Sequence, residues 1–412
     1  MKPKLDIDFV RKEFPALDNE WILFDNAGGS QTLKKVVDGI SEHLLTSDVQ
    51  VGASYYQSQL VRNRIDQVSN EMVTFINAAD VSEIIMGSST TTLLRILSDS
   101  YINIIKEGDE IIVTNLDHEA NIGCWRKLEK RGIRIKTWEL KQDDFQLHTE
   151  DLEKLMTDKT KLVAFTACSN ILGTLTPIKK ITEFIHKHGA LVCVDAVAYA
   201  PHELIDVQDT DVDFYAFSFY KTYGSHYALL YGKKELLLKM PGDNHFFIDQ
   251  NDIPLKFQPG YVNFEIVWGI SGLSKYLSEL SDLHYGKDSA NSMRKKMVQA
   301  YDLFKDQEEL LSARLLDYLN SKNNIKIIGS KSADRNIRVP TISFIKESAD
   351  SETIVSKIDN FKIGIKNGHF YAYRLIEDLG LMKQNGVIRV SMVHYNTIEE
   401  VDKLIKAFDE VL

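Results

Sequence analysis

Two apolar strand patterns that end in polar residues stand in the middle of this 412-residue chain. The first covers residues 191–194 and ends at Asp195. The second is rich in aromatic residues, covers 212–217 and ends at Ser218, and Lys221 follows it closely. Strands that are apolar on both faces are typical of sheets covered on both sides. Polar groups at the carboxyl ends of neighbouring strands in such a sheet usually face a ligand crevice.

Apolar strand segments alternate with helical segments over residues 80–235. We expect strands at 83–86, 110–114, 132–138, 161–166, 191–194 and 212–217, with helices that include 93–105 and 178–188. This alternation predicts an α/β fold with a mostly parallel sheet that is covered on both faces.

A chain of this length exceeds one ordinary core, so two unequal domains are expected. Strands at 325–328, 341–344, 361–365 and 387–391 and helices at 351–358 and 397–410 predict a compact α+β second domain. We therefore divide the chain into an N-terminal segment that packs with the small domain, a large domain and the small domain, at residues 1–20, 21–285 and 286–412.

The composition restricts the class of partner. A net charge of −10 without a basic block argues against nucleic acid. The three cysteines, Cys124, Cys168 and Cys193, form no CxxC pair and suggest neither a disulfide framework nor a metal site. The first 20 residues lack the apolar region of a signal peptide, and no run of about 18 apolar residues would span a membrane. These features predict a cytoplasmic enzyme that handles small molecules.

Asp195 and Lys221 are the acid and the amine that a pyridoxal phosphate enzyme needs. The lysine would form a Schiff base with the cofactor, and the aspartate would keep the pyridine nitrogen protonated so that the ring can accept electrons. The alternative is a buried ion pair beside an ordinary surface lysine, because structural charge pairs also occur.

Other strand ends carry polar groups that suit a cofactor site. The hydroxyl-rich loop Gly87–Thr92 joins a strand to a helix, where free N–H groups and hydroxyls can hold a phosphate or simply cap the helix. His118 follows strand 110–114 and could stack on a flat cofactor, cap a helix or face solvent. Asn170 follows strand 161–166.

Arg389 and two loops complete the candidate features. Arg389 lies in an apolar strand pattern and needs a partner, either a substrate carboxylate or a structural one. The glycine pair that begins at Gly28 follows strand 21–24 and would allow a close backbone approach to a ligand or form a plain turn. Aromatic residues in the irregular segment 241–263 suggest a lid or a subunit contact.

Six motifs, in this order, resemble the class V aminotransferase family of fold-type I pyridoxal phosphate enzymes, and more narrowly its cysteine desulfurase and selenocysteine lyase branch. They cover residues 24–31, 117–123, 200–208, 211–221, 244–248 and 368–374. The resemblance implies a large domain with a mostly parallel, mixed seven-stranded sheet and a smaller α+β domain. It also implies a homodimer whose sites lie at the subunit interface.

The resemblance implies roles toward the cofactor, pyridoxal 5′-phosphate. Lys221 would bind it covalently and move the Cα proton, Asp195 would pair with the pyridinium nitrogen, and His118 would stack on the ring and assist proton transfer. The phosphate would be bound by Thr90, Thr91 and Ser218 together with backbone N–H groups.

The resemblance also implies roles toward an α-amino acid. Asn170 would lie near the ring O3′ and the substrate carboxylate, and Arg389 would clamp that carboxylate. Ala27 and Gly28 would line the substrate site.

Several positions depart from the pattern of the desulfurases. Tyr371 stands where they carry a nucleophilic cysteine, and a phenol cannot accept sulfur as a persulfide. Ala198 replaces the glutamine that contacts O3′, and Tyr220 replaces the histidine before the lysine. Tyr261 replaces a phosphate-binding threonine that the partner subunit donates, and Lys366 replaces a substrate-loop arginine. The hydroxyls of Tyr220 and Tyr261 keep phosphate binding feasible.

We therefore expect a C–S lyase that eliminates a β-substituent without a protein persulfide, with Tyr371 or His369 as the acid. The same residues would also suit an aminotransferase or an epimerase. A non-catalytic scaffold is the alternative outside enzyme function, suggested by Ala198 and Tyr371.

Overall fold

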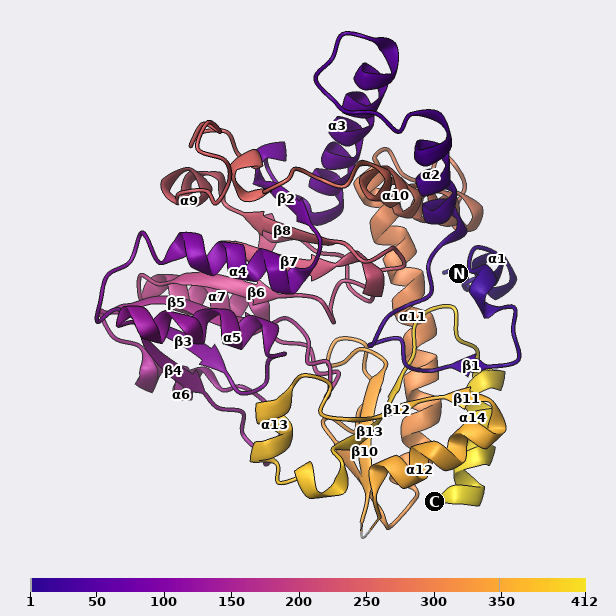
Figure 1. Ribbon diagram of the computed structural model, residues 1–412. Coiled ribbons are helices and arrows are strands. Elements are labelled where there is room, and N and C mark those ends of the chain that lie inside the picture. Colours follow the sequence, from indigo (N-terminus) through magenta and orange to yellow (C-terminus); the bar gives the residue numbers. More distant parts are fainter. Residues whose placement is uncertain (1, 348) are drawn as a thin grey trace.

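The computed structural model describes residues 2–347 and 349–412. Its largest sheet has seven strands in the order β2-β8-β7-β6-β5-β3-β4, as Figure 1 shows. The strands are β2 (Ile84–Gly87), β3 (Glu110–Thr114), β4 (Arg134–Trp138), β5 (Thr160–Thr166), β6 (Leu191–Asp195), β7 (Phe214–Ser218) and β8 (Ala228–Gly232). Strands β4, β3, β5, β6 and β7 run parallel, whereas β8 is antiparallel to both of its neighbours. The predicted α/β fold with a mostly parallel seven-stranded sheet is confirmed.

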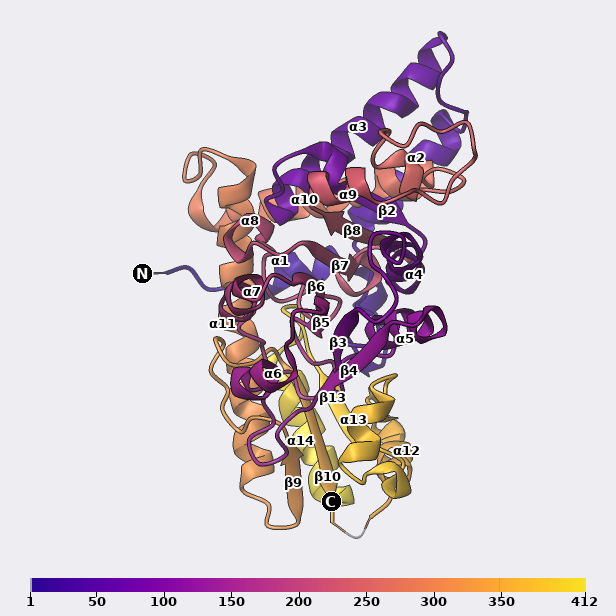
Figure 2. The same ribbon diagram turned by 90° about the vertical axis from the view of Figure 1, so that its left-hand side faces the viewer.

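Successive side chains of a strand point to opposite faces of the sheet. Because these strands carry apolar residues on both faces, helices cover the sheet on both sides. In β6, Val192 and Val194 belong to one apolar core and Cys193 belongs to the other. The core around Cys193 contains α4 (Thr90–Tyr101), α5 (Ala120–Arg126) and α9 (Lys234–Lys239). The opposite core contains α2 (Lys34–Thr46), α3 (Tyr56–Ile76), α6 (Thr149–Leu155), α7 (Ile178–Lys187), α10 (Phe264–Tyr285) and α11 (Met293–Asn320). Figure 2 shows α4 and α5 on one side of the sheet and α7 and α11 on the other.

A second, antiparallel sheet lies below the first in Figure 1, with the strand order β12-β13-β10-β9. Its strands are β9 (Ile325–Ile328), β10 (Thr341–Lys346), β12 (Lys366–Gly368) and β13 (Val387–Ser391). Apolar residues of this sheet share a core with α11, α12 (Ser351–Ile358) and α14 (Ile398–Val411), and Phe24 enters the same core. The other described helices are α1 (Ile7–Lys12), α8 (Val207–Thr210) and α13 (Tyr373–Asp378). None of the described helices is long and apolar enough to cross a membrane.

Several elements differ from the sequence-based expectation, among them the strand expected at 361–365, helix α4 and helix α3. The strand expected at 361–365 is divided into β11 (Ile363–Gly364) and β12, and β11 pairs in parallel with β1 (Ile22–Leu23). Helix α4 begins at Thr90, three residues earlier than expected, because Ser89 Oγ accepts the N–H of Thr92 at 3.1 Å and caps the helix. Helix α3 was not expected from the sequence.

Candidate active site

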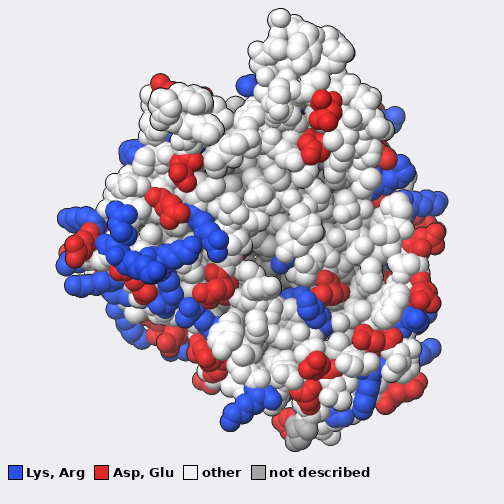
Figure 3. Space-filling view, viewed as in Figure 1, with Lys and Arg blue, Asp and Glu red and all other residues white. Residues whose placement is uncertain are grey.

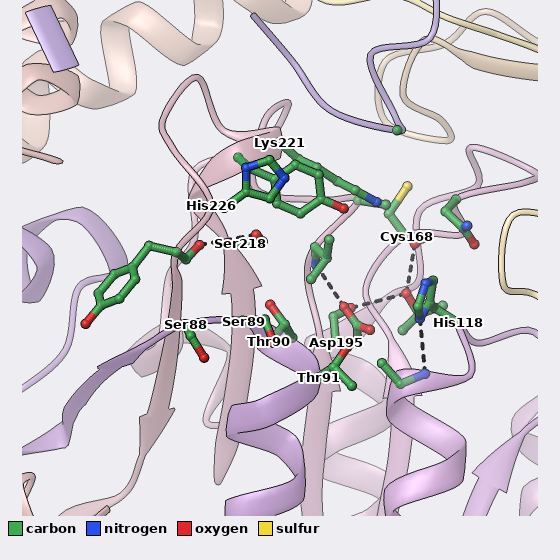
Figure 4. Close-up of a pocket in the computed structure, with 18 residues that line it drawn as sticks. Ser88, Ser89, Thr90, Thr91, His118, Cys168, Asp195, Ser218, Lys221 and His226 are labelled. Atoms are coloured by element: carbon green, nitrogen blue, oxygen red, sulfur yellow. Dashed lines mark hydrogen bonds between the residues drawn. The ribbon is translucent and has the colours of Figure 1, made fainter. Parts of the chain in front are cut away.

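A cavity of about 360 Å³ opens at the carboxyl ends of the parallel strands, the edge at which α/β sheets bind ligands. Figure 3 shows a hollow on this face of the molecule, and Figure 4 shows the side chains around the cavity. The structure brings the following predicted residues together in its wall: Gly28, Thr90, Thr91, His118, Asn170, Asp195, Ser218, Tyr220 and Lys221. Residues that follow or end six separate strands, β1, β2, β3, β5, β6 and β7, therefore meet here.

A second cavity of about 350 Å³ lies next to the first. The two cavities share the residues Gly28, His118, Asn170, Tyr220 and Lys221. The second cavity is also lined by Ala27, Lys366, His369, Phe370, Tyr371 and Arg389. Lys221 thus lies at the junction of a hydroxyl-lined cavity and a cavity that contains Arg389.

Lys221 is held in the single turn that follows β7, and it is buried. Among the described residues, its amine makes no hydrogen bond or ion pair, although the ring of Tyr220 lies 5.7 Å away. Burial, followed by the positive charge of Arg389, lowers the pKa of Lys221 to about 8. The amine is therefore prepared for nucleophilic attack near neutral pH.

Asp195 ends β6, the strand next to β7. Its Oδ1 accepts the N–H of Val197 at 2.9 Å, and burial raises the pKa of the carboxyl group. Asp195 forms no ion pair with any described residue, so no described side chain neutralises its charge by direct contact. A buried carboxyl group that faces a cavity in this way suits a ligand with a cationic N–H group.

Hydroxyl groups gather at the N-terminus of α4. Thr90 Oγ1 is buried and has no hydrogen-bond partner among the described residues. A buried hydroxyl without a partner is unfavourable, and the first N–H groups of a helix also lack partners inside the helix. A phosphate group would accept hydrogen bonds from the Thr90 hydroxyl and from these N–H groups, and the helix dipole also attracts an anion to this end of α4. These features, together with Asp195 and Lys221, fit pyridoxal phosphate.

His118 lies between β3 and α5, and its Nδ1 accepts the N–H of Ala120 at 3.1 Å. Burial and the nearby Lys221 lower the pKa of His118 to about 4, so the ring is neutral at neutral pH. Its ring lies 5.2 Å from the ring of Tyr371 with an interplanar angle of 31°. The wall of the cavity therefore contains a neutral flat ring that suits stacking on a flat cofactor.

Arg389 has a structural partner, which was one of the two alternatives predicted for it. Its Nη2 donates to Asp25 Oδ1 at 2.7 Å, and its Nη1 donates to the Asn170 carbonyl oxygen at 3.1 Å. The guanidinium also lies 3.7 Å from the centre of the Phe370 ring. Its Nε makes no hydrogen bond with any described residue. At least one N–H group of the Arg389 guanidinium is thus left for a substrate carboxylate.

The side chain of Asn170 points to the loop that carries Tyr371. Its Nδ2 donates to the Phe370 carbonyl oxygen at 2.9 Å, and the N–H of Glu119 donates to the Tyr371 carbonyl oxygen at 2.8 Å. Phe370 and Tyr371 both have positive φ, 48° and 62°, a conformation that is unfavourable for residues other than glycine. The loop is held in this conformation from both sides, and Tyr371 is 68% exposed.

None of the three cysteines offers a reactive thiol to the site. Cys124, Cys168 and Cys193 are all buried, and burial raises the pKa of each thiol. Cys168 reaches the wall of the first cavity but is only 1% exposed. A thiol that is buried and protonated is a poor nucleophile.

Tyr261 lies apart from the other predicted residues. It lines a separate cavity beside α3, where its hydroxyl accepts a hydrogen bond from Arg62 at 3.4 Å. Within one chain the structure therefore does not bring Tyr261 to Lys221. The expectation that Tyr261 serves the site of a partner subunit stays a prediction.

Asp25 and His226 were not singled out from the sequence as site residues. Asp25 was visible as an acid after the first strand, but its partner Arg389 is 364 residues away. His226 lines the first cavity because β8 is antiparallel and so begins at the edge where the parallel strands end. In the sequence, His226 is marked only as a polar residue just before an apolar segment.

The sequence model of the family described as "Aminotransferase class-V" matches residues 22–404. The chain is 39% identical to the "Aminotransferase-like protein FGM3" of Gibberella zeae, over 98% of each chain. It is 31% identical to the "Cysteine desulfurase-like protein ustD" of Aspergillus flavus, over 99% of this chain and 91% of the relative. The apo structure of a cysteine desulfurase from Thermococcus onnurineus NA1 has a TM-score of 0.86 at 24% identity, covers 100% of this chain and 99% of its own, and shows the same fold.

The chain belongs to the class V aminotransferase family. Members of this family are pyridoxal phosphate enzymes that act on amino-acid substrates and are generally homodimers. Its relatives include proteins named as aminotransferase-like and as cysteine desulfurase-like.

Proposed function

We propose that this protein is a pyridoxal phosphate enzyme that acts on an α-amino acid and breaks a Cβ–S bond by elimination, without a protein persulfide. One observation carries the proposal. The buried amine of Lys221 lies at the junction of a cavity that suits the cofactor and a cavity that suits an amino acid, and neither cavity contains an accessible thiolate.

The first cavity supplies the residues that would hold the cofactor. Lys221 would bind its aldehyde covalently, Asp195 would accept the N–H of its ring nitrogen, and the neutral ring of His118 would stack on it. Thr90, Thr91 and Ser218 would bind its phosphate together with the N–H groups at the start of α4. When bound, the cofactor supplies an electron sink for the pair of electrons left at Cα.

The second cavity supplies the residues that would hold the substrate. Arg389 would bind the α-carboxylate through the part of its donor set that Asp25 leaves free, and the backbone at Ala27 and Gly28 would line the same region. The amine of Lys221, once released, would take up the Cα proton. Its lowered pKa matches this task, because a base works best when its pKa is near the working pH.

The chemistry of the leaving sulfur favours elimination over desulfuration. In elimination the Cα–H and Cβ–S bonds break, sulfur leaves as a thiolate or sulfide, and hydrolysis of the remaining enamine gives a keto acid and ammonium. No electron acceptor and no acceptor thiol are needed. Desulfuration to alanine would transfer neutral sulfur to a thiolate, and every cysteine of this chain is buried with a raised pKa. Tyr371 or His369 would protonate the leaving sulfur.

A homodimer is part of the proposal, in line with the family. The described surface includes exposed apolar residues in α2, at the start of α3 and in the loop before α10: Leu44, Leu45, Tyr55, Tyr56, Phe246 and Phe247. The upper part of the molecule in Figure 3, over α3, carries few charged side chains. Tyr261 belongs to the same region and would reach the phosphate site of the partner subunit.

Incubation of the purified, cofactor-loaded protein with single amino acids tests the proposal. We expect a cysteine-type substrate to give sulfide and keto acid in equal amounts, with no persulfide on any of the three cysteines by mass spectrometry. Conversion of the cofactor to its amine form without sulfide would identify an aminotransferase. Inversion at Cα alone would identify an epimerase, and a protein that never binds the cofactor would overturn the enzyme proposal altogether.

A further inference from the structure

We propose that His226 is a phosphate-binding residue of this site. The inference rests on the proposed binding of pyridoxal phosphate. It concerns a residue that the sequence alone did not single out.

The strand order places His226 beside the other phosphate-binding candidates. In the sheet, Ala228 of β8 pairs with Gly87 of β2 on one side and with Ser218 of β7 on the other. His226 comes two residues before Ala228, and the loop that leads to Thr90 begins just after Gly87. The beginning of β8 and the ends of β2 and β7 therefore meet at one point of the sheet edge.

Hydrogen bonds fix the turn that carries His226. The N–H of Tyr227 donates to the Ser225 carbonyl oxygen at 2.8 Å, and the Tyr227 carbonyl oxygen accepts the N–H of Phe219 at 2.8 Å. The same carbonyl oxygen accepts the hydroxyl of Ser218 at 3.2 Å. The backbone on either side of His226 is thus tied to the end of β7, directly beside Ser218.

The side chain of His226 is oriented but has free nitrogens. Its ring stacks on the ring of Tyr220, with 4.9 Å between centroids and an interplanar angle of 4°. Neither ring nitrogen makes a hydrogen bond with a described residue, and the ring lines the first cavity, where Figure 4 shows it with Ser218 and Thr90. Stacking leaves the edge of the imidazole, with its N–H donor, available for a ligand.

The composition of the cavity wall leaves His226 as the suitable donor. Among the described residues that line the first cavity, Lys221 is the only lysine or arginine, and it would be used by the covalent bond to the cofactor. His118 follows β3, which lies three strands away from β7 in the sheet. A phosphate dianion at the hydroxyls of Thr90 and Ser218 would otherwise meet only neutral donors, and an imidazole can donate in either protonation state.

Two substitutions separate hydrogen bonding from stacking. His226→Phe keeps a flat ring on Tyr220 but removes the N–H donor, whereas His226→Gln keeps an N–H donor and removes the ring. His188→Gln, at an exposed histidine at the end of α7, is the matched control. Unfolding midpoints in urea establish that each variant is folded.

The ligands are pyridoxal phosphate and pyridoxal, which lacks the phosphate. Binding to the full-length apoprotein is measured by borohydride trapping and by mass spectrometry of the Lys221 peptide. We expect His226→Phe to raise the Kd for pyridoxal phosphate roughly 10- to 100-fold and to leave capture of pyridoxal unchanged. We expect His226→Gln to raise the Kd less than His226→Phe does, and His188→Gln to have no effect.

The outcomes are distinct. An unchanged Kd for pyridoxal phosphate in His226→Phe would overturn the inference and leave His226 as a stacking residue only. An equal loss for both ligands would also overturn it, because the effect would then not depend on the phosphate. If the wild-type protein captured neither ligand at Lys221, the proposed function would fail instead.

Discussion

Arg389 Nη2 and Asp25 Oδ1 lie 2.7 Å apart and join the last strand of the small sheet to the segment that follows β1. The arginine side chain is 2% exposed and the aspartate side chain is 35% exposed. The ion pair therefore holds a buried guanidinium at the edge of the substrate cavity while water still reaches the carboxylate.

Asp25→Asn should destabilise the protein and weaken catalysis, because it leaves the Arg389 charge buried without a neutralising partner. We expect a loss of about 2 kcal/mol in the free energy of unfolding, below the 3–5 kcal/mol for a fully buried pair because Asp25 is partly hydrated. Urea unfolding measures this loss, and kcat/KM should fall about 10-fold as the guanidinium loses its orientation. Asp38→Asn, in the exposed Lys34–Asp38 pair, should change the unfolding free energy by less than about 0.5 kcal/mol. Equal effects at both positions would contradict this account.

The lowered pKa of Lys221 predicts the pH dependence of cofactor capture by the apoprotein. Only the neutral amine attacks an aldehyde, so the rate should rise about 10-fold per pH unit and level off near pH 8, not near the ordinary lysine value of 10.5. Arg389→Gln removes one of the two effects that lower the pKa of Lys221, so the inflection of this variant should move to higher pH. Stopped-flow measurement of pyridoxal phosphate binding gives both profiles, and a wild-type inflection near 10.5 would refute the prediction.

The positions of Asp195, Ser218 and Lys221 were predictable because each depends on a local pattern, an apolar strand that ends in a polar residue. The parallel sheet then places these ends together. The pairing of Asp25 with Arg389 was left open, since it depends on how the first strand meets the C-terminal sheet. The contact between Tyr371 and His118 depends on the same arrangement and on the unfavourable φ of Tyr371. Such contacts join residues that are far apart in sequence and leave no periodic signal.

Asp195→Asn should separate the role of Asp195 in catalysis from any role in stability. An amide cannot keep the ring nitrogen protonated, so we expect kcat to fall at least about 100-fold while Lys221 still binds the cofactor. Burial raises the pKa of the Asp195 carboxyl, so its charged form is less favourable in the folded state than in the unfolded state. The stability of the apoprotein should therefore decline as the pH rises from the ordinary aspartate pKa through the raised pKa of Asp195. The variant should lack this part of the pH dependence. Thermal unfolding of both apoproteins at several pH values measures it, and an apo variant that is markedly less stable at neutral pH would contradict the argument.

Tyr371→Phe should slow elimination when the leaving group needs a proton and should have no effect when it does not. Tyr371 lies beside His118, which lines both cavities, whereas His369 uses its Nδ1 to accept the N–H of Tyr371 at 3.1 Å. We therefore expect kcat for cysteine to fall about 100-fold in Tyr371→Phe, the typical contribution of a positioned acid, and to change much less in His369→Asn. With β-chloroalanine, which expels chloride without protonation, Tyr371→Phe should keep wild-type kcat. An equal loss with both substrates would mean that Tyr371 positions the loop and is not the acid. A loss confined to cysteine in His369→Asn would assign the proton to His369.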